Sequence, residues 1–209
     1  MRLTTTSEPS RERWNRRWAG ERAHASTDPS PFLIAEIADL SPGTALDLAC
    51  GAGRNAVWLA ERGWRVTAAD FSGVALGMAR RLAAERRVDV EWIEADVVSW
   101  TAPSPAYDLV CVLYLQLPAP ERRSALARAA AAVRPGGTLV IVGHDLLNLT
   151  EGWGGPTQPD VLFTPDDVVA ELGDLRIETA RRVRRAVQGP DGAREAIDAL
   201  VRATRSPSA

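Results

Sequence analysis

The chain of 209 residues is 45% hydrophobic and 25% charged and has a net charge of −2, the composition of an ordinary globular domain. The slightly negative charge argues against non-specific nucleic-acid binding, and the absence of lysine excludes Schiff-base and Walker-type lysine chemistry. No apolar run reaches the ~20 residues that span a bilayer, and the polar N-terminus lacks a signal-peptide core, so we expect a cytoplasmic protein.

Residues 1–40 are predicted to form an N-terminal helical cap. A short helix is expected at Glu12–Glu21, where Trp14 and Trp18 lie four residues apart and therefore share one face. A second, amphipathic helix is expected at Pro31–Leu40, and Ser41-Pro42-Gly43 ends it. The remaining residues, 41–209, are predicted to form the main domain.

Apolar strands and amphipathic helices then alternate along the chain. The expected helices are Arg54–Arg62, Gly73–Glu85 and Ala119–Val133, the last of them ended by Pro135-Gly136-Gly137. The expected strands are Thr44–Ala49, Arg65–Ala69, Val90–Ala95, Asp108–Leu115 and Thr138–Gly143. Nearly continuous apolar strands are typical of a parallel sheet that is covered by helices on both faces. The pattern predicts a doubly wound α/β fold.

The C-terminal part departs from this alternation. Residues 146–163, rich in glycine, are long for a connector and are interpreted as a lid-like insert. After a helix at Thr164–Leu172, two strands are expected at Arg176–Gln188 and Glu195–Arg205, joined by the hairpin signal Gly189-Pro190-Asp191-Gly192. The final strand should therefore run antiparallel in a seven-stranded, mostly parallel sheet. The arginine run at residues 181–185 is interpreted as charge that protects an edge strand.

The two cysteines, Cys50 and Cys111, lie in apolar stretches and are predicted to be buried thiols. No group of cysteines and histidines has metal-ligand spacing, so no metal site is predicted.

Candidate ligand-binding residues follow the expected strands, where open α/β sheets bind their ligands. In the first loop, Gly51 and Gly53 allow a sharp turn and a close approach to a ligand, while Asp47 precedes them in an apolar strand and needs a polar partner. Asp70 ends the next strand and is suited to ribose hydroxyls, and Asp96 follows the third strand, where it could accept an adenine amino group. Each aspartate could instead be a turn or capping residue.

The glycine loop alone leaves two cofactor classes open. Gly51-Ala52-Gly53-Arg54-Asn55-Ala56 satisfies the loose dinucleotide fingerprint G-x-G-x-x-G/A, and Asp70 would serve a nicotinamide cofactor too. Against a dehydrogenase stand Asp47 before the loop, the position of Asp96, the antiparallel tail and the lack of a Tyr-x-x-x-Lys pair.

Taken in order, five motifs resemble the class I S-adenosylmethionine-dependent methyltransferases. They span roughly Thr44–Asp145 and are Asp47-Leu-Ala-Cys-Gly51-Ala-Gly53, Asp70-Phe71-Ser72, Ala95-Asp96-Val97, Tyr107-Asp108-Leu109-Val110 and Arg134-Pro135-Gly136-Gly137. Cys50 stands where the family often has glycine. The string Gly51-Ala52-Gly53-Arg54-Asn55 and the tryptophan-bearing N-terminal helix are similar to small-molecule methyltransferases of the tellurite-resistance and thiopurine types.

This resemblance implies S-adenosylmethionine as the cofactor. By the same resemblance, Asp47, Gly51 and Gly53 would line its methionine end, Asp70 and Phe71 would flank the ribose, Asp96 and Val97 would hold the adenine, and Leu113 would flank the sulfonium. The implied reaction is in-line transfer of the methyl group to an O, N, S or heavier chalcogen nucleophile of a small molecule. A non-catalytic S-adenosylmethionine-binding module remains an alternative, as does an NAD-dependent dehydrogenase.

The acceptor side is less defined by the sequence. The loop after Asp108–Leu115 lacks the Asn/Asp-Pro-Pro-aromatic motif of nucleic-acid amino methylators, so a small-molecule acceptor is favoured. His144 and Asp145 could form a base or orienting pair, and Tyr114 could orient a nucleophile or simply line the pocket. Trp14, Trp18 and Trp153 could wall an apolar acceptor pocket, or merely pack the cap and the insert onto the domain.

Overall fold

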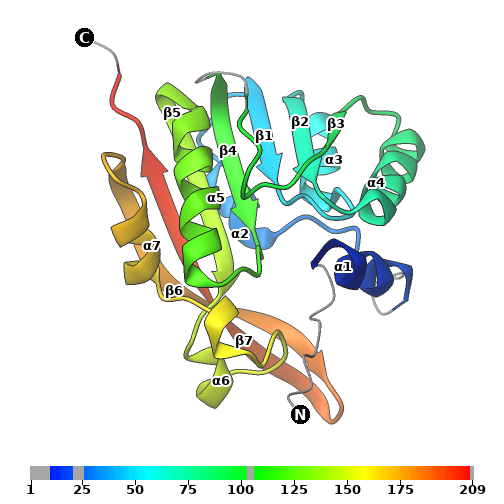
Figure 1. Cartoon of the computed structure of the whole chain (residues 1–209), viewed down its shortest axis with the longest axis vertical. Helices are drawn as coiled ribbons and strands as arrows, with labels where there is room; N and C mark the ends of the chain where they lie inside the picture. The colour runs from blue at the N-terminus through cyan, green and yellow to red at the C-terminus, as the bar shows by residue number, and fades with distance from the viewer. Residues whose placement is uncertain (1–9, 21–25, 103–105, 208–209) are drawn as a thin grey trace, which may run out of the picture.

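The computed structural model describes residues 10–20, 26–102 and 106–207. In these residues the chain forms one seven-stranded sheet of order β3-β2-β1-β4-β5-β7-β6 (Figure 1). The predicted cap at residues 1–40 falls partly outside the described ranges. Within the described ranges, no helix combines the length and the apolarity needed to cross a membrane.

Five parallel strands form one side of the sheet, from the edge strand β3 to β5. They are β1 (Thr44–Leu48), β2 (Arg65–Asp70), β3 (Glu91–Glu94), β4 (Tyr107–Leu113) and β5 (Val133–His144). The side chains of β1 and β4 are buried almost throughout because helices cover both faces of the sheet. The predicted doubly wound α/β fold is confirmed.

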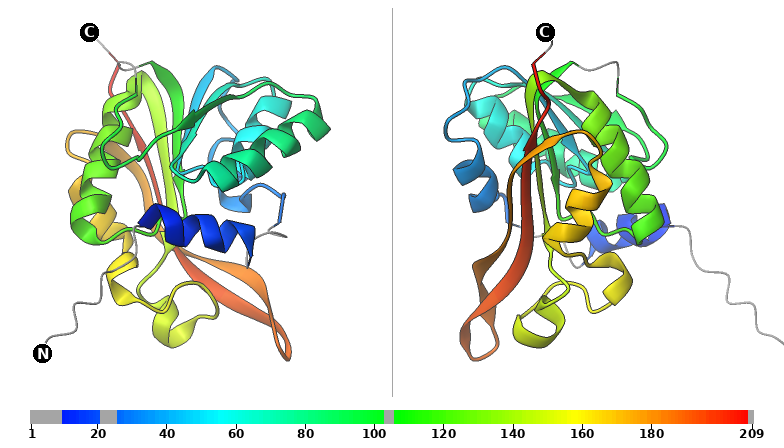
Figure 2. Two further views of the ribbon diagram at one scale, coloured as in Figure 1. Left: turned by 45° about the vertical axis from the view of Figure 1, so that its right-hand side comes forward. Right: turned by 90° about the vertical axis from the view of Figure 1, so that its left-hand side faces the viewer.

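The helices divide between the two faces. On one face, α2 (Pro31–Glu36), α3 (Arg54–Glu61) and α4 (Gly73–Arg86) contribute Leu33, Leu59 and Leu76 to one apolar cluster. On the other face, α5 (Ala119–Ala132) and α7 (Pro165–Glu171) contribute Leu126 and Val168 to a second cluster. The predicted tryptophan helix is α1 (Ser10–Ala19), which lies across the end of the sheet rather than on either face (Figures 1 and 2).

The predicted antiparallel tail is confirmed in a long hairpin. Strand β7 (Gly192–Thr204) runs antiparallel to both of its neighbours, β5 and β6 (Arg176–Gly189). The tip of the hairpin extends past the body of the sheet, beside the insert that contains α6 (Asn148–Glu151) (Figure 2).

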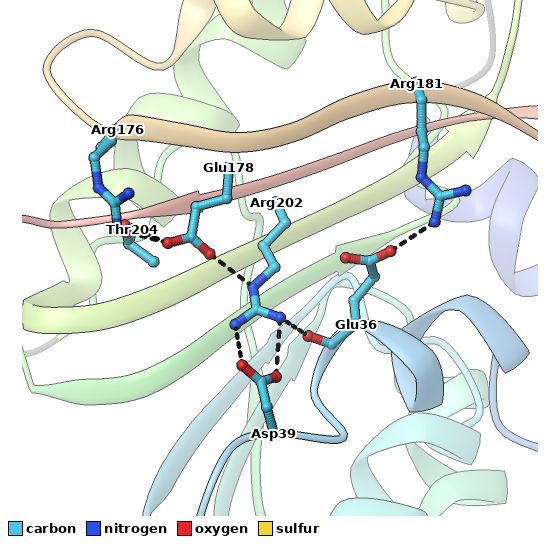
Figure 3. A network of polar contacts seen from close by, with 7 residues as sticks. All are labelled: Glu36, Asp39, Arg176, Glu178, Arg181, Arg202 and Thr204. Carbon is cyan, nitrogen blue, oxygen red and sulfur yellow. Dashed lines mark hydrogen bonds and ion pairs between the residues drawn. The ribbon is translucent and has the colours of Figure 1, made fainter.

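A polar network fastens the hairpin to the N-terminal cap (Figure 3). Arg202 of β7 makes a bidentate hydrogen bond to Asp39, at 2.9 and 3.0 Å, and an ion pair with Glu178 of β6 at 3.1 Å. On β6, Arg181 pairs with Glu36 of α2 at 3.0 Å. Strand β6 is the edge strand that its arginine run predicted, but these arginines bind carboxylates as well as facing solvent.

The junction between α5 and β5 differs from the prediction. We expected Pro135-Gly136-Gly137 to end the helix and the strand to begin at Thr138, whereas α5 ends at Ala132 and β5 begins at Val133, opposite Tyr107. Gly136 takes φ +78°, and the register shifts there before Thr138 pairs with Leu109. The glycines therefore absorb an irregularity inside the strand and do not precede it.

Both thiols are buried and free, as predicted. Burial is the main cause that raises the pKa of Cys50 and of Cys111 well above the ordinary thiol value. Neither cysteine is therefore a reactive thiolate at neutral pH.

Candidate functional site

A cavity of about 380 Å³ opens where the carboxyl ends of β1, β2, β4 and β5 meet the inner side of α1. Its walls include ten of the residues that were singled out from the sequence. They are Trp14, Trp18, Gly51, Asp70, Phe71, Asp96, Val97, Leu113, Tyr114 and His144. Residues separated by up to 130 positions in the chain thus converge on one space, at the edge of the sheet where a doubly wound fold binds its ligands.

The loop between β1 and α3 approaches the cavity with bare backbone. Gly51 takes φ +55°, and its N–H donates a 2.9 Å hydrogen bond to Asp70. A Cβ atom at Gly51 would lie 2.7 Å from the ring of Trp18, so only glycine fits beneath this tryptophan. Gly53, with φ +78°, precedes α3 but does not line the cavity, because Ala79 and Trp92 pack against it.

Asp70 sits at the end of β2 with both carboxylate oxygens engaged by backbone. Oδ2 accepts from the N–H of Gly51 and Oδ1 accepts from the N–H of Ser72, each at 2.9 Å. Burial raises the pKa of Asp70, and these donors offset only part of the rise. Each carboxylate oxygen can accept a second hydrogen bond, so Asp70 can still receive hydroxyl groups from the cavity side.

Asp47 lies behind the glycine loop and does not reach the cavity wall. Its Oδ1 accepts a weak hydrogen bond from Cys111 Sγ at 3.6 Å, and its buried Oδ2 has no partner among the described residues. Burial raises the pKa of Asp47 to about 7, despite the opposing effects of Cys111 and of the positive charge of Arg54. The carboxyl therefore changes charge near neutral pH.

Asp96 and Val97 line the wall beyond β3. Asp96 Oδ1 accepts from the N–H of Val98 at 2.9 Å, so this side chain also shapes its own turn. Its second oxygen is available to a ligand. Asp96 thus combines the turn role and the position expected of a binding residue.

His144 ends β5 and meets a carboxylate that the sequence did not indicate. Its Nδ1 lies 3.1 Å from Oδ1 of Asp198, a residue of β7 whose side chain is fully buried. The other oxygen of Asp198 accepts from the hydroxyl of Tyr114 at 2.9 Å and from Nε of Arg185 at 3.0 Å. The rings of Tyr114 and His144 are 5.1 Å apart between centroids.

The charges in this cluster are mutually compensating. Burial alone would raise the pKa of Asp198, but His144 and Arg185 outweigh it, so the pKa lies below the ordinary value. Burial, and then the negative charge of Asp198, raise the pKa of Tyr114. Asp198 is therefore an anion at neutral pH, and the Tyr114 hydroxyl stays protonated and donates a hydrogen bond to it.

Two residues predicted for the acceptor pocket lie elsewhere. Asp145 turns away from His144: it is fully buried and accepts from the N–H of Leu147 and from Arg182, at 2.8 and 3.0 Å. Trp153 is 44% exposed, with the guanidinium of Arg194 5.6 Å from its ring centroid. The structure brings neither of them to the cavity wall.

The insert at residues 146–163 is tied to β7 and contains a 3₁₀ turn, Pro159–Val161, after α6. Asn148 accepts from the N–H of Ile197 at 2.7 Å, and Trp153 donates its N–H to the carbonyl of Glu195 at 2.9 Å. The backbone of Gly155 packs on the imidazole of His144, where an added Cβ would lie 3.0 Å from the ring. In this arrangement the insert covers one side of His144.

Asp198, Arg185 and Arg54 are site residues that sequence reasoning missed. A lone aspartate in the apolar segment Ala196–Val201 is a signal of the same kind that singled out Asp47. Arg185 was hidden within the arginine run, and its guanidinium, like that of Arg54, lies within 6 Å of the Tyr114 ring, at 5.5 and 5.7 Å.

Comparison with known proteins agrees with this geometry. Residues 45–137 match the family model of a methyltransferase domain. The chain is 36% identical over 104 residues to a demethylmenaquinone methyltransferase of Thermus thermophilus. The matched region covers 49% of this chain and 47% of that relative. The chain is also 33% identical over 163 residues to a trans-aconitate 2-methyltransferase of Azoarcus sp.. That match covers 77% of this chain and 58% of the relative.

A solved structure concerned with the conversion of a disulfide bond into a thioacetal group during echinomycin biosynthesis superposes with a TM-score of 0.76. It is 21% identical and the match covers 95% of this chain and 93% of that one, so this likeness concerns the fold. The chain spans about half the length of the curated relatives it matches. Residues 45–137 are therefore similar to a methyltransferase domain, and the order and directions of the strands are those of the class I methyltransferase fold.

Proposed function

We propose that this chain transfers the methyl group of S-adenosylmethionine to a nucleophilic atom of a small molecule, in the cytoplasm. The observation that carries the proposal is the convergence of the Gly51 loop, Asp70 and Asp96 on one cavity together with His144. Its volume of about 380 Å³ falls in the range of small-molecule sites, about 300–1,000 Å³. A nucleic acid would need a broad basic surface, which a chain of net charge −2 does not favour.

The residues at the cavity fit the cofactor. Asp70 offers carboxylate oxygens to ribose hydroxyls, Asp96 offers one to the adenine amino group, and Phe71 and Val97 supply apolar wall beside them. Near the methionine end, the bare backbone at Gly51 permits close approach, and the unpartnered oxygen of Asp47 lies behind it. An ammonium group placed near that loop would favour the charged form of Asp47.

S-adenosylmethionine supplies a methyl group that its sulfonium already activates. The task left to the protein is to hold the acceptor in line with the methyl–sulfur bond and to exclude water, because alignment contributes most of the rate in such a displacement. Leu113, Trp14 and Trp18 provide apolar surface for this purpose. In-line transfer needs few catalytic side chains, which agrees with a site that is largely a binding cavity.

Calorimetric titration of the purified chain with S-adenosylhomocysteine and with NAD tests the cofactor assignment. We expect a saturable heat with S-adenosylhomocysteine and none with NAD. Asp70→Ala should weaken S-adenosylhomocysteine binding at least 10-fold, because each lost hydrogen bond to a charged group is worth about 1.5–3 kcal/mol. Asp89→Ala is the matched control, because Asp89 is exposed and lies before β3, away from the cavity.

A screen of small acceptors, read as S-adenosylhomocysteine released, tests catalysis. Turnover of at least one acceptor would support the proposal. Tight cofactor binding with no turnover on any acceptor would contradict it and favour a non-catalytic binding module. An unchanged affinity in Asp70→Ala would remove Asp70 from the site.

A further inference from the structure

We propose that His144, positioned by Asp198, is the base that receives the acceptor's proton, and that the acceptor is therefore a hydroxyl compound. This inference rests on the proposed methyl transfer and names the acceptor class for the same cavity. His144 is the base, because it lines the cavity, whereas Asp198 is a positioning residue that acts through it.

The first argument is the orientation of the imidazole. Nδ1 of His144 and Oδ1 of Asp198 lie 3.1 Å apart, and both atoms are buried without a hydrogen-bond partner among the described residues. A lone pair on Nδ1 would face the negative charge of the carboxylate, whereas an Nδ1–H group is attracted to it, so Asp198 favours the tautomer with the proton on Nδ1. The lone pair then resides on Nε2, which forms no hydrogen bond within the described residues. The ring is part of the cavity wall, so this free lone pair is the one that an acceptor can reach.

The second argument is that Asp198 is held in place from three elements. Tyr114 at the end of β4, Arg185 on β6 and His144 on β5 all contact its carboxylate, whose side chain is fully buried. Such a carboxylate stays charged and cannot rotate away. It stabilises an imidazolium if His144 takes up a proton, as the buried aspartate of a catalytic His–Asp pair does.

The third argument is where the pair lies along the sheet. His144 ends β5 and Asp70 ends β2, with β1 and β4 between them, so three strand spacings, about 14 Å, separate the two positions. The adenosine end proposed at Asp70 is thus remote from His144. The base stands at the β4–β5 side of the cavity, which the adenosine would leave open to an acceptor.

The proton balance identifies the acceptor class. The hydroxyl oxygen bonds to the methyl carbon, the methyl–sulfur bond breaks with its electron pair passing to sulfur, and the hydroxyl proton passes to Nε2 of His144. A thiolate or heavier chalcogenide is already ionised and needs no base, whereas a hydroxyl is a weak nucleophile until its proton leaves. A histidine whose positive charge is balanced by Asp198 once it takes up the proton therefore serves an oxygen nucleophile.

The turnover test pairs phenols with thiophenols of the same carbon skeleton, at pH 7.5 and saturating S-adenosylmethionine. His144→Gln should lower kcat for the phenols at least about 100-fold, the usual contribution of a positioned base, and leave the thiophenol rate within a few-fold of wild type. S-adenosylhomocysteine affinity should not change. Arg184→Gln is the control, because Arg184 is a neighbour on β6 that instead pairs with Glu195 in solvent.

The pH dependence of kcat separates a base from a structural ion pair. The groups that face His144 are Asp198, Tyr114 and Arg185, and Asp145 faces Arg182 instead. A base must be neutral to accept a proton, so kcat for phenols should fall toward acidic pH, and His144→Gln should abolish that fall. Asp47 titrates at about pH 7, so Asp47→Asn must retain the fall.

A spectroscopic readout tests the positioning role without turnover. The chain has two histidines, so His24→Gln leaves His144 as the sole signal in a long-range ¹H–¹⁵N spectrum of histidine-labelled protein. We expect the Nδ1–H tautomer with an unprotonated Nε2 at neutral pH, and loss of that preference in Asp198→Asn. An Nε2–H tautomer in the wild type would contradict the proposal that Asp198 positions His144 as a base.

The outcomes distinguish this inference from the function on which it rests. Turnover of thiophenols but not phenols, or phenol turnover in His144→Gln within twofold of wild type, would overturn the base and leave methyl transfer standing. No turnover on any probe would contradict the proposed function and the inference with it. Selective loss of phenol turnover together with the Nδ1–H tautomer would establish both.

Discussion

At the scale of single residues, Asp47 shows how a buried carboxyl links ligand binding to stability. It lies in an apolar strand, with one oxygen on Cys111 and the other without a partner among the described residues. Its raised pKa of about 7, against 3.8 as the ordinary value, means that folding favours the protonated form. Between these values the native state holds a proton that the unfolded chain has lost, so the free energy of unfolding falls as pH rises.

Asp47→Asn should therefore stabilise the cofactor-free protein more at pH 8 than at pH 5. The wild type loses up to about 1.4 kcal/mol per pH unit from this group as pH rises toward 7, whereas the amide does not titrate. Urea unfolding at the two pH values measures the difference. A constant difference between the variants at both pH values would show that Asp47 ionises normally in the folded chain.

Gly51→Ala should weaken S-adenosylhomocysteine binding at least 10-fold. The left-handed φ of +55° strains alanine, and its Cβ would meet the Trp18 ring at 2.7 Å, so the loop or the tryptophan must move. Gly63→Ala is the matched control, because Gly63 has φ +85° but sits between α3 and β2 with only Pro42 nearby, at 3.9 Å. Both variants should lose stability, and calorimetry should show lost affinity only in Gly51→Ala.

Residue-level prediction from sequence succeeded where a side chain stands at a strand end and failed where its partner is distant in the chain. Asp70 and Asp96 follow parallel strands whose ends must meet, so their convergence was predictable. The partner of His144 is Asp198, 54 residues away on a strand whose register no local pattern specifies. The adjacent Asp145 was the natural candidate, but neighbouring side chains at this strand end point in different directions.

At the scale of elements, α5 and α7 are joined by a buried ion pair. Arg122 donates two hydrogen bonds to Glu171, at 2.8 and 3.0 Å, with side-chain exposures of only 6% and 8%. The guanidinium of Arg122 also lies 5.1 Å from the ring centroid of Phe163, where the insert rejoins the body. Helix α7 itself begins with a capping box between Thr164 and Asp167.

Arg122→Met should lower the free energy of unfolding by about 3–5 kcal/mol, since it leaves the Glu171 charge buried with only Arg123, at 3.9 Å, nearby. The double variant Arg122→Met/Glu171→Met should recover much of that loss, because no charge remains buried. Urea denaturation of both measures this coupling. Equal stability of the two variants would indicate that Glu171 reaches solvent.

The positions of most helices and strands could be predicted from the sequence, because the spacing of apolar residues and the turn residues specify structure locally. The Thr164 cap, the glycine hairpin and the apolar strands all specify structure within a few residues. The start of β5 did not follow, because Val133 joins the sheet only through its pairing with Tyr107, a contact 26 residues back in the chain. Strand ends are set by the neighbouring strand as much as by their own residues.

At the scale of the whole molecule, the cap, the sheet and the hairpin meet around one cavity. Helix α1 brings Trp14 and Trp18 to it, β5 brings His144, and β6 brings Arg185. The polar network around Arg202 and Arg181 holds the hairpin to α2 and to Asp39 in the turn after it (Figure 3). The sequence motifs predicted the part of the cavity wall that follows β1, β2 and β3, whereas the part built by the hairpin depends on tertiary pairing.

Because the ligand is expected to bridge these parts, S-adenosylhomocysteine should raise the thermal midpoint in a concentration-dependent manner. Binding to the native state alone adds about 2.7 kcal/mol of stability at a ligand concentration 100 times Kd. A thermal-shift titration measures the rise, and NAD at the same concentrations is the comparison. Equal shifts with both ligands would argue against a site built for the methyl donor.

A crystal structure of the chain with S-adenosylhomocysteine tests the central claim most directly. Our account predicts the ligand in the cavity, with ribose hydroxyls on Asp70, the adenine at Asp96 and Val97, and the sulfur directed toward the side of Leu113 and His144. A ligand bound elsewhere, or one that makes no contact with Asp70 in the cavity, would contradict it.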